Sequence, residues 1–196
     1  MISVILLAAG ESKRMGQPKL LLPLGKTTIL EQTVDNYLNS EASEVIVVAG
    51  SGVEEITRLL SCRPVKVVVN PAYRQGMSTS IITGLNSIDD SARAVMLALA
   101  DQPLIDSRII DHLIQEFNNH NKGISIPTHH GRRGHPVIFS IRYQEELLRL
   151  KGDMGGRQII RTHSDDVLEV AIDSESITVD IDNISDYQSL LNKTRH

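Results

Sequence analysis

The sequence predicts an α/β fold, in which one mostly parallel sheet is flanked by helices. Through the first two thirds of the chain, apolar runs alternate with segments of helical periodicity, and the first run, Ile2–Ala8, contains no charge. Such runs are typical of strands buried on both faces of a parallel sheet, and short loops between them are typical of right-handed crossover connections. A chain of 196 residues suits one core, so we expect a single domain over residues 1–196.

Four apolar runs are expected to form the centre of this sheet. They are Ile2–Ala8, Glu44–Ala49, Val65–Val69 and Ala94–Ala100. Between them, Thr28-Ile-Leu-Glu31 has the form of a capping box, which predicts a helix that continues to about Asn39. Further helices are expected over about Val53–Leu60, from the GMSTS segment to Ile88, and over Arg108–Asn118.

The last third of the chain is less regular, and we expect it to cover one end of the sheet. Helices are expected over Ile141–Leu150, after GDMGGRQII and near Ser185–Asn192. Short strands are predicted over Gly123–Pro127, His135–Phe139, Val167–Ala171 and Ile177–Asp182.

Composition excludes several classes of protein. A formal net charge of −4 gives no basic excess for a nucleic-acid backbone, and 3% aromatic residues without tryptophan disfavour a base-stacking surface. No apolar run approaches the roughly 18 residues of a membrane span. Cys62 is the only cysteine, so no intramolecular disulfide is expected. The N-terminal run lacks a basic leader, and together these features favour a reducing cytoplasm.

A glycine-rich basic segment follows the first predicted strand. Gly10 and Gly16 flank Lys13 and Arg14, and Lys19 comes next. Backbone N–H groups and cations at the carboxyl end of a strand form an anion site, most often for phosphate. The spacing matches neither a Walker loop nor a dinucleotide-binding fingerprint. The alternative is an ordinary strand-to-loop turn with solvated basic side chains.

Carboxylates occur at the ends of two predicted strands. Asp101 follows the run Ala94–Ala100, where it is placed to meet a cation such as Mg²⁺, which favours oxygen ligands. In the strand predicted over Ile177–Asp182, alternation puts Asp180 and Asp182 on one face. If this strand end reaches Asp101, two carboxylates would share one metal. The alternative for Asp101 is a helix-capping or loop aspartate, and the alternative for Asp180 and Asp182 is an ordinary solvated strand end.

Histidines and a second glycine-rich segment complete the candidates. His129, His130 and His135 lie close together, but no recognised zinc spacing includes them. Gly134-His135-Pro136 instead suggests a substrate-facing turn in which His135 donates to a phosphate or substrate oxygen. Gly152–Arg157 is compatible with a further anion-binding loop or with a simple helix end followed by a new helix.

Six segments, taken in order, resemble one family of enzymes. They are LAAGESKRMGQPKLLLPL, NPAYRQGMSTSIITGL, LALADQPLI, RRGHPVIF, GDMGGRQII and VDID. The pattern resembles the nucleotidyltransferases related to molybdenum-cofactor enzymes, and within them the cytidylyltransferase branch. The resemblance implies a Rossmann-like, nucleotide-diphospho-sugar transferase-like fold and Mg²⁺-dependent transfer of CMP from CTP to a phosphorylated acceptor, with a molybdoenzyme as a transient partner and no nucleic-acid or membrane partner.

The resemblance also implies roles for particular residues. The backbone of Ala8, Ala9 and Gly10 would contact the nucleotide, while Arg14 and Lys19 would bind its phosphates. Gly76, Met77 and Ser78 would lie along the base and ribose, and His135 would face the acceptor. Asp101 and Asp182 would hold the metal. After VDID the family usually continues Thr-Pro-Glu-Asp, whereas this chain has Asn183-Ile-Ser-Asp, so the choice between Asp180 and Asp182 stays open.

Three functions remain at this point. The first is a cytidylyltransferase acting on a molybdopterin-type cofactor, which is implied by Ala9 in a position where related guanylyltransferases have glycine. The second keeps the reaction but uses a sugar phosphate or another small phosphorylated alcohol as acceptor. The third is a non-catalytic factor that binds a cofactor and delivers it to a molybdoenzyme.

Overall fold

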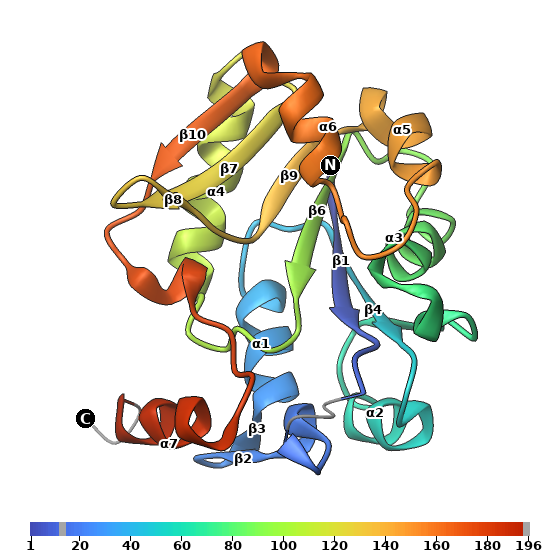
Figure 1. Ribbon diagram of the computed structural model, residues 1–196, viewed down its shortest axis with the longest axis vertical. Helices are drawn as coiled ribbons and strands as arrows, with labels where there is room; N and C mark the ends of the chain where they lie inside the picture. The colour runs from blue at the N-terminus through green and yellow to red at the C-terminus, as the bar shows by residue number, and fades with distance from the viewer. Residues whose placement is uncertain (12–14, 194–196) are drawn as a thin grey trace.

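A computed structural model shows one continuous mixed sheet with helices on both faces, and it describes residues 1–11 and 15–193 (Figure 1). The strands are β1 (Ile2–Ala8), β4 (Glu44–Ala49), β5 (Lys66–Val69), β6 (Ala94–Leu99), β7 (Ile124–His129), β8 (Arg132–Arg133), β9 (Val137–Ser140) and β10 (Val167–Ala171). The short hairpin strands β2 (Pro23–Leu24) and β3 (Thr27–Thr28) form a separate ribbon. The helices are α1 (Ile29–Leu38), α2 (Val53–Leu59), α3 (Met77–Leu85), α4 (Ser107–Asn119), α5 (Gln144–Leu148), α6 (Arg157–Thr162) and α7 (Ile184–Lys193).

The strand order places β1 at the centre of the sheet. The order is β10-β7-β9-β6-β1-β4-β5, and β8 pairs with β7 outside this path. β1 runs parallel to β4 and β6, and β4 runs parallel to β5. β9 is antiparallel to β6 and β7, which makes the sheet mixed but mostly parallel. The carboxyl ends of β1, β4 and β6 therefore lie along one edge, where ligands bind in sheets of this kind.

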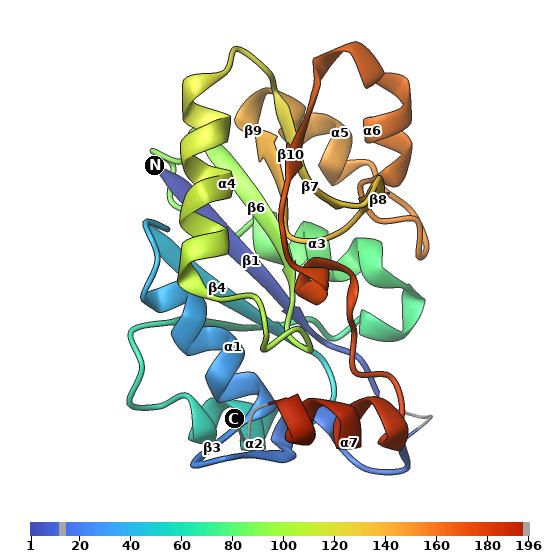
Figure 2. The same cartoon turned by 90° about the vertical axis from the view of Figure 1, so that its left-hand side faces the viewer.

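Each face of the sheet is covered by its own helices and apolar cluster. Figure 2 shows α1 and α4 on one side of the sheet and α3, α5 and α6 on the other. The α1 and α4 side buries residues such as Leu30, Tyr37 and Leu113, while the other side buries Ile81, Leu147 and Phe139. This single-domain arrangement confirms the predicted fold class. No helix in the described ranges is long and apolar enough to cross a membrane.

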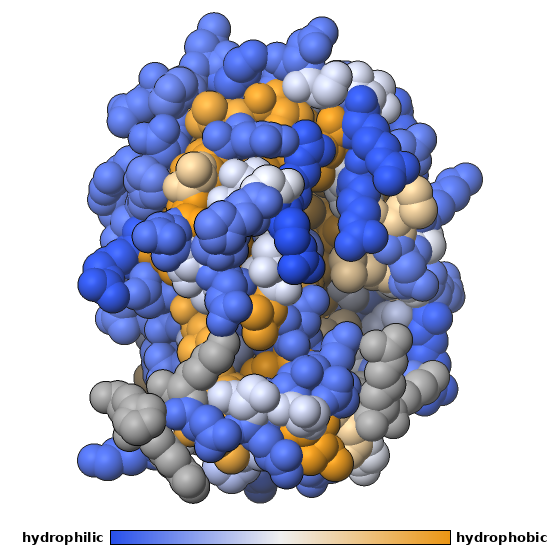
Figure 3. All heavy atoms as spheres, turned by 60° about the vertical axis from the view of Figure 1, so that its left-hand side comes forward, coloured by the Kyte–Doolittle hydropathy of each residue, from blue (hydrophilic) through white to orange (hydrophobic). Residues whose placement is uncertain are grey.

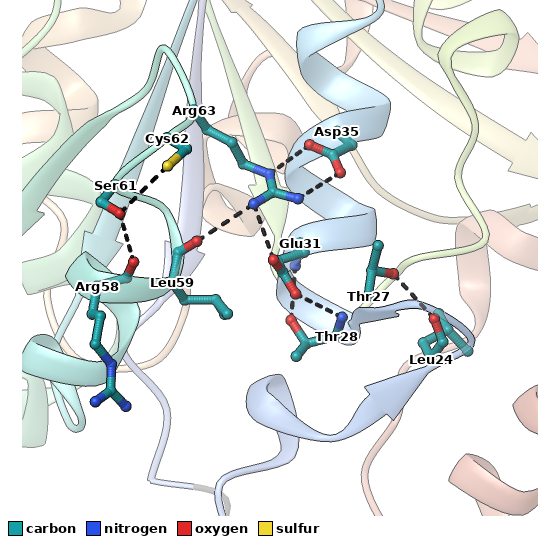
Figure 4. Close-up of polar contacts among 10 residues, drawn as sticks. All are labelled: Leu24, Thr27, Thr28, Glu31, Asp35, Arg58, Leu59, Ser61, Cys62 and Arg63. Atoms are coloured by element: carbon teal, nitrogen blue, oxygen red, sulfur yellow. Dashed lines mark hydrogen bonds and ion pairs between the residues drawn. The ribbon is translucent and has the colours of Figure 1, made fainter.

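The four predicted central strands are confirmed to within a residue at their ends, and so is the capping box of α1. The Thr28 hydroxyl accepts from the Glu31 amide at 3.2 Å, and the Glu31 carboxylate accepts from the Thr28 amide at 2.9 Å. The same Glu31 side chain also accepts from Arg63 at 3.0 Å, while Arg63 binds Asp35 through two nitrogens at 2.7 and 2.9 Å (Figure 4). Arg63, which follows α2, thus ties that segment to α1.

The strand predicted over Ile177–Asp182 is wrong. A 3-10 turn spans Glu175–Thr178, and residues 179–182 continue without strand pairing. β10 ends the strand order, and after it the chain turns back across the sheet, with the Ile177 carbonyl accepting from the His135 amide at 2.9 Å. This path, rather than strand alternation, brings the late aspartates to the carboxyl edge of the sheet.

Candidate active site

A cavity of about 440 Å³ opens at the carboxyl edge of the sheet; it is called here the glycine-loop cavity. Its wall comes from the ends of β1 and β6, from the start of α3 and from the segment after the last 3-10 turn. The predicted site residues that line it are Ala8, Ala9, Gly10, Lys19, Gly76, Met77, Asp101 and Asp182, together with Asp180. These residues come together because the carboxyl ends of parallel strands lie along one edge of the sheet.

Lys19 stands between two carboxylates in this cavity. Its Nζ forms an ion pair with Asp101 and a second one with Asp182 at 3.3 Å. The side chains of Lys19 and Asp101 are each 15% exposed, whereas that of Asp182 is 49% exposed. Burial works to lower the pKa of Lys19, but the two carboxylates outweigh it, and the pKa lies above its usual value. Lys19 is therefore a fully charged cation at neutral pH.

Asp180 adds a third carboxylate beside this pair. Its Oδ1 accepts from Gln102 Nε2 at 2.6 Å. Burial raises the pKa of Asp180, and the negative charges of Asp101 and Asp182 raise it further, against the hydrogen bond from Gln102. Gln102 is itself buried, and among the described residues its Oε1 has no partner. The cluster thus holds more negative charge than Lys19 alone balances.

This donor set fits a divalent cation that shares its ligands with a substrate. Carboxylate oxygens are the protein ligands of Mg²⁺, which also keeps waters and binds phosphates. In the described ranges, no group of three or more His, Cys, Asp or Glu side chains is close enough to form a metal cage. Asp101 and Asp182 are therefore suited to hold the ion from one side only, with phosphate oxygens on the other.

The start of α3 is held by a loop from the last third of the chain. The Met77 amide donates to Asp153 Oδ1 at 2.9 Å, and the Ser78 amide donates to the Gly152 carbonyl at 3.0 Å. Gly76 has φ 114°, and a Cβ there would lie 2.6 Å from the Gly152 backbone, so only glycine permits this approach. The loop that carries Asp153 thereby fixes one wall of the glycine-loop cavity.

A second cavity, of about 400 Å³, adjoins the first; it is called here the α6 cavity. Its lining includes His135, Phe139 and Arg157, and it shares Leu7, Met77, Leu99, Asp153 and Asp180 with the glycine-loop cavity. Burial lowers the pKa of His135, and the charge of Arg157 lowers it further, against Asp101, which raises it. His135 is therefore a neutral imidazole at pH 7, able to donate one hydrogen bond. Figure 3 shows hydrophobic surface within a hollow whose rim is hydrophilic.

Some predicted residues have a different placement, and others were not anticipated. Arg14 lies outside the described residues. Ser78 is buried in the first turn of α3, and Ser80 lines the glycine-loop cavity. Gln102 and Asp153 were missed. Gln102 could have been found from its position directly after Asp101. No residue near Asp153 in the sequence indicates that Asp153 caps a distant helix.

Comparison with known proteins gives a family and several full-length relatives. The family model described as "MobA-like NTP transferase domain" matches residues 4–167. The molybdenum cofactor cytidylyltransferase of Escherichia coli K12 is 28% identical, with 95% of this chain and 93% of the relative covered. The nicotine blue oxidoreductase of Paenarthrobacter nicotinovorans is also 28% identical, with 97% and 96% covered. Similarity over the whole length thus extends to relatives with different named activities.

Solved structures show the same fold. The Rv0371c protein of Mycobacterium tuberculosis H37Rv has a TM-score of 0.88 at 29% identity, with 97% of each chain covered. A structure of Rv0371c described as a complex with manganese has a TM-score of 0.84 at 28% identity, with 97% of each chain covered.

Proposed function

The chain belongs to the MobA-like NTP transferase family, and from this premise we propose that it is a cytidylyltransferase. It transfers CMP from CTP to the phosphate of a small acceptor and releases pyrophosphate. The acceptor that the resemblance favours is a molybdopterin-type molybdenum cofactor. The full-length similarity to the Escherichia coli cytidylyltransferase supports this choice. We place the protein in the cytoplasm, with a molybdoenzyme as the recipient of its product.

One observation carries the proposal: Lys19 pairs with Asp101 and Asp182 in the glycine-loop cavity, and the neighbouring Asp180 also lines the α6 cavity. An anion bound at the Asp180 side of the α6 cavity would therefore lie next to this cluster. Transfer between two phosphorylated substrates needs such a place, because two mutually repelling anions must be held together in line. The glycine-loop cavity would hold CTP, and the α6 cavity would hold the acceptor.

The proposed reaction requires no covalent bond between the protein and a substrate. An oxygen of the acceptor phosphate forms a bond to the α-phosphorus of CTP, while the bond from that phosphorus to the β-bridging oxygen breaks. The electron pair of the broken bond leaves with pyrophosphate. Lys19, together with Arg14, would bind the phosphates whose charge grows in the transition state. The His135 N–H would donate to the acceptor and orient it.

Asp101 and Asp182 would hold Mg²⁺, which when bound neutralises phosphate charge and polarises the α-phosphoryl group. In the protein without substrates, Lys19 balances part of the charge of these carboxylates. Substrate binding would therefore turn Lys19 toward phosphate, while the carboxylates turn toward the cation. Electrostatic attraction on both sides favours this exchange of partners.

A base-selecting role is proposed for Ala9. It lines the glycine-loop cavity at the position where the related guanylyltransferases have glycine. A methyl group that narrows the base site disfavours a two-ring base more strongly than it favours a one-ring base, because excess bulk clashes. CTP would therefore be preferred over GTP.

The main alternative keeps the reaction with another acceptor, such as a sugar phosphate. A delivery factor without turnover would have no need for the lysine and carboxylates that converge here. The oxidoreductase relative raises a third possibility, hydride transfer, but such chemistry gives no role to three carboxylates around a lysine.

The test is a screen for pyrophosphate release from each of the four NTPs with Mg²⁺ or Mn²⁺. It would be run with molybdopterin-type cofactor, with simple sugar phosphates and without acceptor. We expect release from CTP only when the cofactor is present. Release with sugar phosphates alone would favour the second acceptor class, and no release from any NTP under any condition would overturn the transferase proposal.

A further inference from the structure

Two arginines on α6 line the α6 cavity without carboxylate partners. Arg157 and Arg161 are both exposed, and in the part of the chain that the structure describes neither guanidinium forms an ion pair. Arg133, which lines the same cavity, differs from them because it pairs with Glu169 at 2.7 Å. Two aspartates, Asp153 and Asp180, also line this cavity, but they accept hydrogen bonds from the Met77 amide and from Gln102, and neither pairs with an arginine of α6.

The spacing of these arginines puts both on one face of the helix. Residues four apart are neighbours on a helix surface, and like charges at that spacing repel each other. The placement of the helix is specific as well. At Gly156, directly before α6, a Cβ would lie 2.5 Å from the Phe139 ring, so a glycine lets α6 pack closely against β9. Arg157 and Arg161 therefore lie next to each other at the wall of the α6 cavity, although their charges repel.

The two arginines lie at different depths along the cavity. Leu99 of β6 lines both cavities, whereas Leu97, two residues earlier on the same strand, lines only the α6 cavity. Two residues along a strand correspond to about 7 Å, so the α6 cavity extends away from Asp101. Arg157 acts on His135, which is also within electrostatic reach of Asp101, and Arg161 lies one helical turn beyond Arg157. Apolar side chains such as Ile126 and Phe139 also line this cavity.

We propose that the α6 cavity binds a small molecule with an apolar or planar body and two anionic groups. One group faces the Lys19 and Asp101 cluster, and the other is held by Arg157 and Arg161. Resting on the proposed function, this molecule is the acceptor. Its phosphate is the first anionic group, and the second is a further phosphate, carboxylate or oxyanion at the opposite end. Guanidinium groups suit this task because their planar N–H pairs match the oxygen geometry of such anions.

The test uses two probes that differ by one anionic group. Phenyl phosphate has a single one, and 4-carboxyphenyl phosphate has a second across the ring. Binding of each at millimolar concentrations would be measured by calorimetry on the full chain, with and without α,β-methylene-CTP, which occupies the nucleotide site but cannot release pyrophosphate. The variants are Arg157→Gln and Arg161→Gln. The control is Arg58→Gln, an exposed arginine of α2 that points away from its neighbours and lines neither cavity (Figure 4).

We expect the wild type and Arg58→Gln to bind 4-carboxyphenyl phosphate about tenfold more tightly than phenyl phosphate, the size of one charge-assisted hydrogen bond. Arg161→Gln should abolish this preference, and Arg157→Gln should reduce it, with unchanged thermal unfolding in both variants. Equal binding of the two probes, no binding of either, a preference that survives in both variants, or displacement by the CTP analogue would each overturn the proposal.

The same proteins distinguish this inference from the proposed function. If the protein releases pyrophosphate from CTP but binds the two probes equally, the transferase proposal stands and the proposal of a cavity for two anionic groups is rejected. If the protein prefers the doubly anionic probe through Arg161 but releases no pyrophosphate from any NTP, the proposal for the cavity stands and the transferase proposal is rejected.

Discussion

Replacement of Asp101 by asparagine should separate activity from stability. The amide keeps the shape of the side chain but removes its charge, and with it one proposed metal ligand. In the folded protein, Lys19 loses its ion pair with Asp101 but keeps the carboxylate of Asp182 at 3.3 Å. Lys19 is therefore not left as an uncompensated buried charge, which would cost several kcal/mol. The expected loss of stability is about 1 kcal/mol, the value of one hydrogen bond.

The catalytic effect of the same change should be much larger. A preorganised charged group that acts on the transition state contributes roughly 10²–10³-fold to turnover. We therefore expect kcat for pyrophosphate release to fall by at least about 100-fold in Asp101→Asn at saturating Mg²⁺. Chemical denaturation would measure stability in the same samples. Asp90→Asn is the matched control, because Asp90 is an exposed aspartate before β6, at the end of that strand opposite Asp101.

Two results would refute this reasoning. Turnover near the wild-type rate in Asp101→Asn would show that the carboxylate has no role in the reaction. A stability loss of several kcal/mol would show that Asp182 does not compensate Lys19, and the activity loss would then report unfolding. Asp182→Asn, which changes a half-exposed residue, should reduce turnover with even less effect on stability.

Three further outcomes are expected. Arg63→Met should lower the free energy of unfolding by about 1–3 kcal/mol, because the charge-assisted hydrogen bonds to Asp35 and Glu31 are lost. Denaturation midpoints unchanged from the wild type would contradict the proposed link between α2 and α1. Burial and Arg157 lower the pKa of His135, so as pH falls from about 6.5 toward the lowered value the unfolded chain binds the extra proton first. Stability should therefore decrease over that window, and the decrease should be smaller in His135→Asn. An identical pH profile for both proteins would argue against a partly buried neutral imidazole. Ala9→Gly should reduce the kcat/KM ratio of CTP over GTP by about tenfold, and an unchanged ratio would remove the steric explanation.

The central strands and α1 could be predicted from the sequence because their local sequence patterns agree with their surroundings in the folded protein. β1 and β6 contain no charged residue, and β4 contains one only at its first position, Glu44. Each of the three strands is buried on both faces, as such runs predict. The capping box of α1 depends on residues three apart, so it too was visible. The segment Ile177–Asp182 failed because its alternation matches a strand, while β10 ends the strand order and the chain turns back across the sheet instead.

The site was only partly predictable for a related reason. Parallel strands end at one edge of a sheet, so topology alone was enough to place the glycine-rich loop, the GMSTS segment and Asp101 at that edge. The contact of Lys19 with Asp182, however, joins residues 163 positions apart, and no local pattern encodes it. The same holds for Asp153, which caps α3 from 76 residues away in the chain. Contacts of this kind follow from how the last third of the chain packs, where sequence signals were weakest.

The most direct measurement of the central claim follows the α-phosphate of CTP. The wild-type protein would be incubated with CTP labelled at the α-phosphorus, Mg²⁺ and molybdopterin-type cofactor, and the products would be separated by chromatography. We expect the label to move into a compound containing both CMP and the acceptor, in equal amount to the pyrophosphate released, and Asp101→Asn to form almost none of it. Label that stays in CTP, or that appears only as free CMP, would contradict the account.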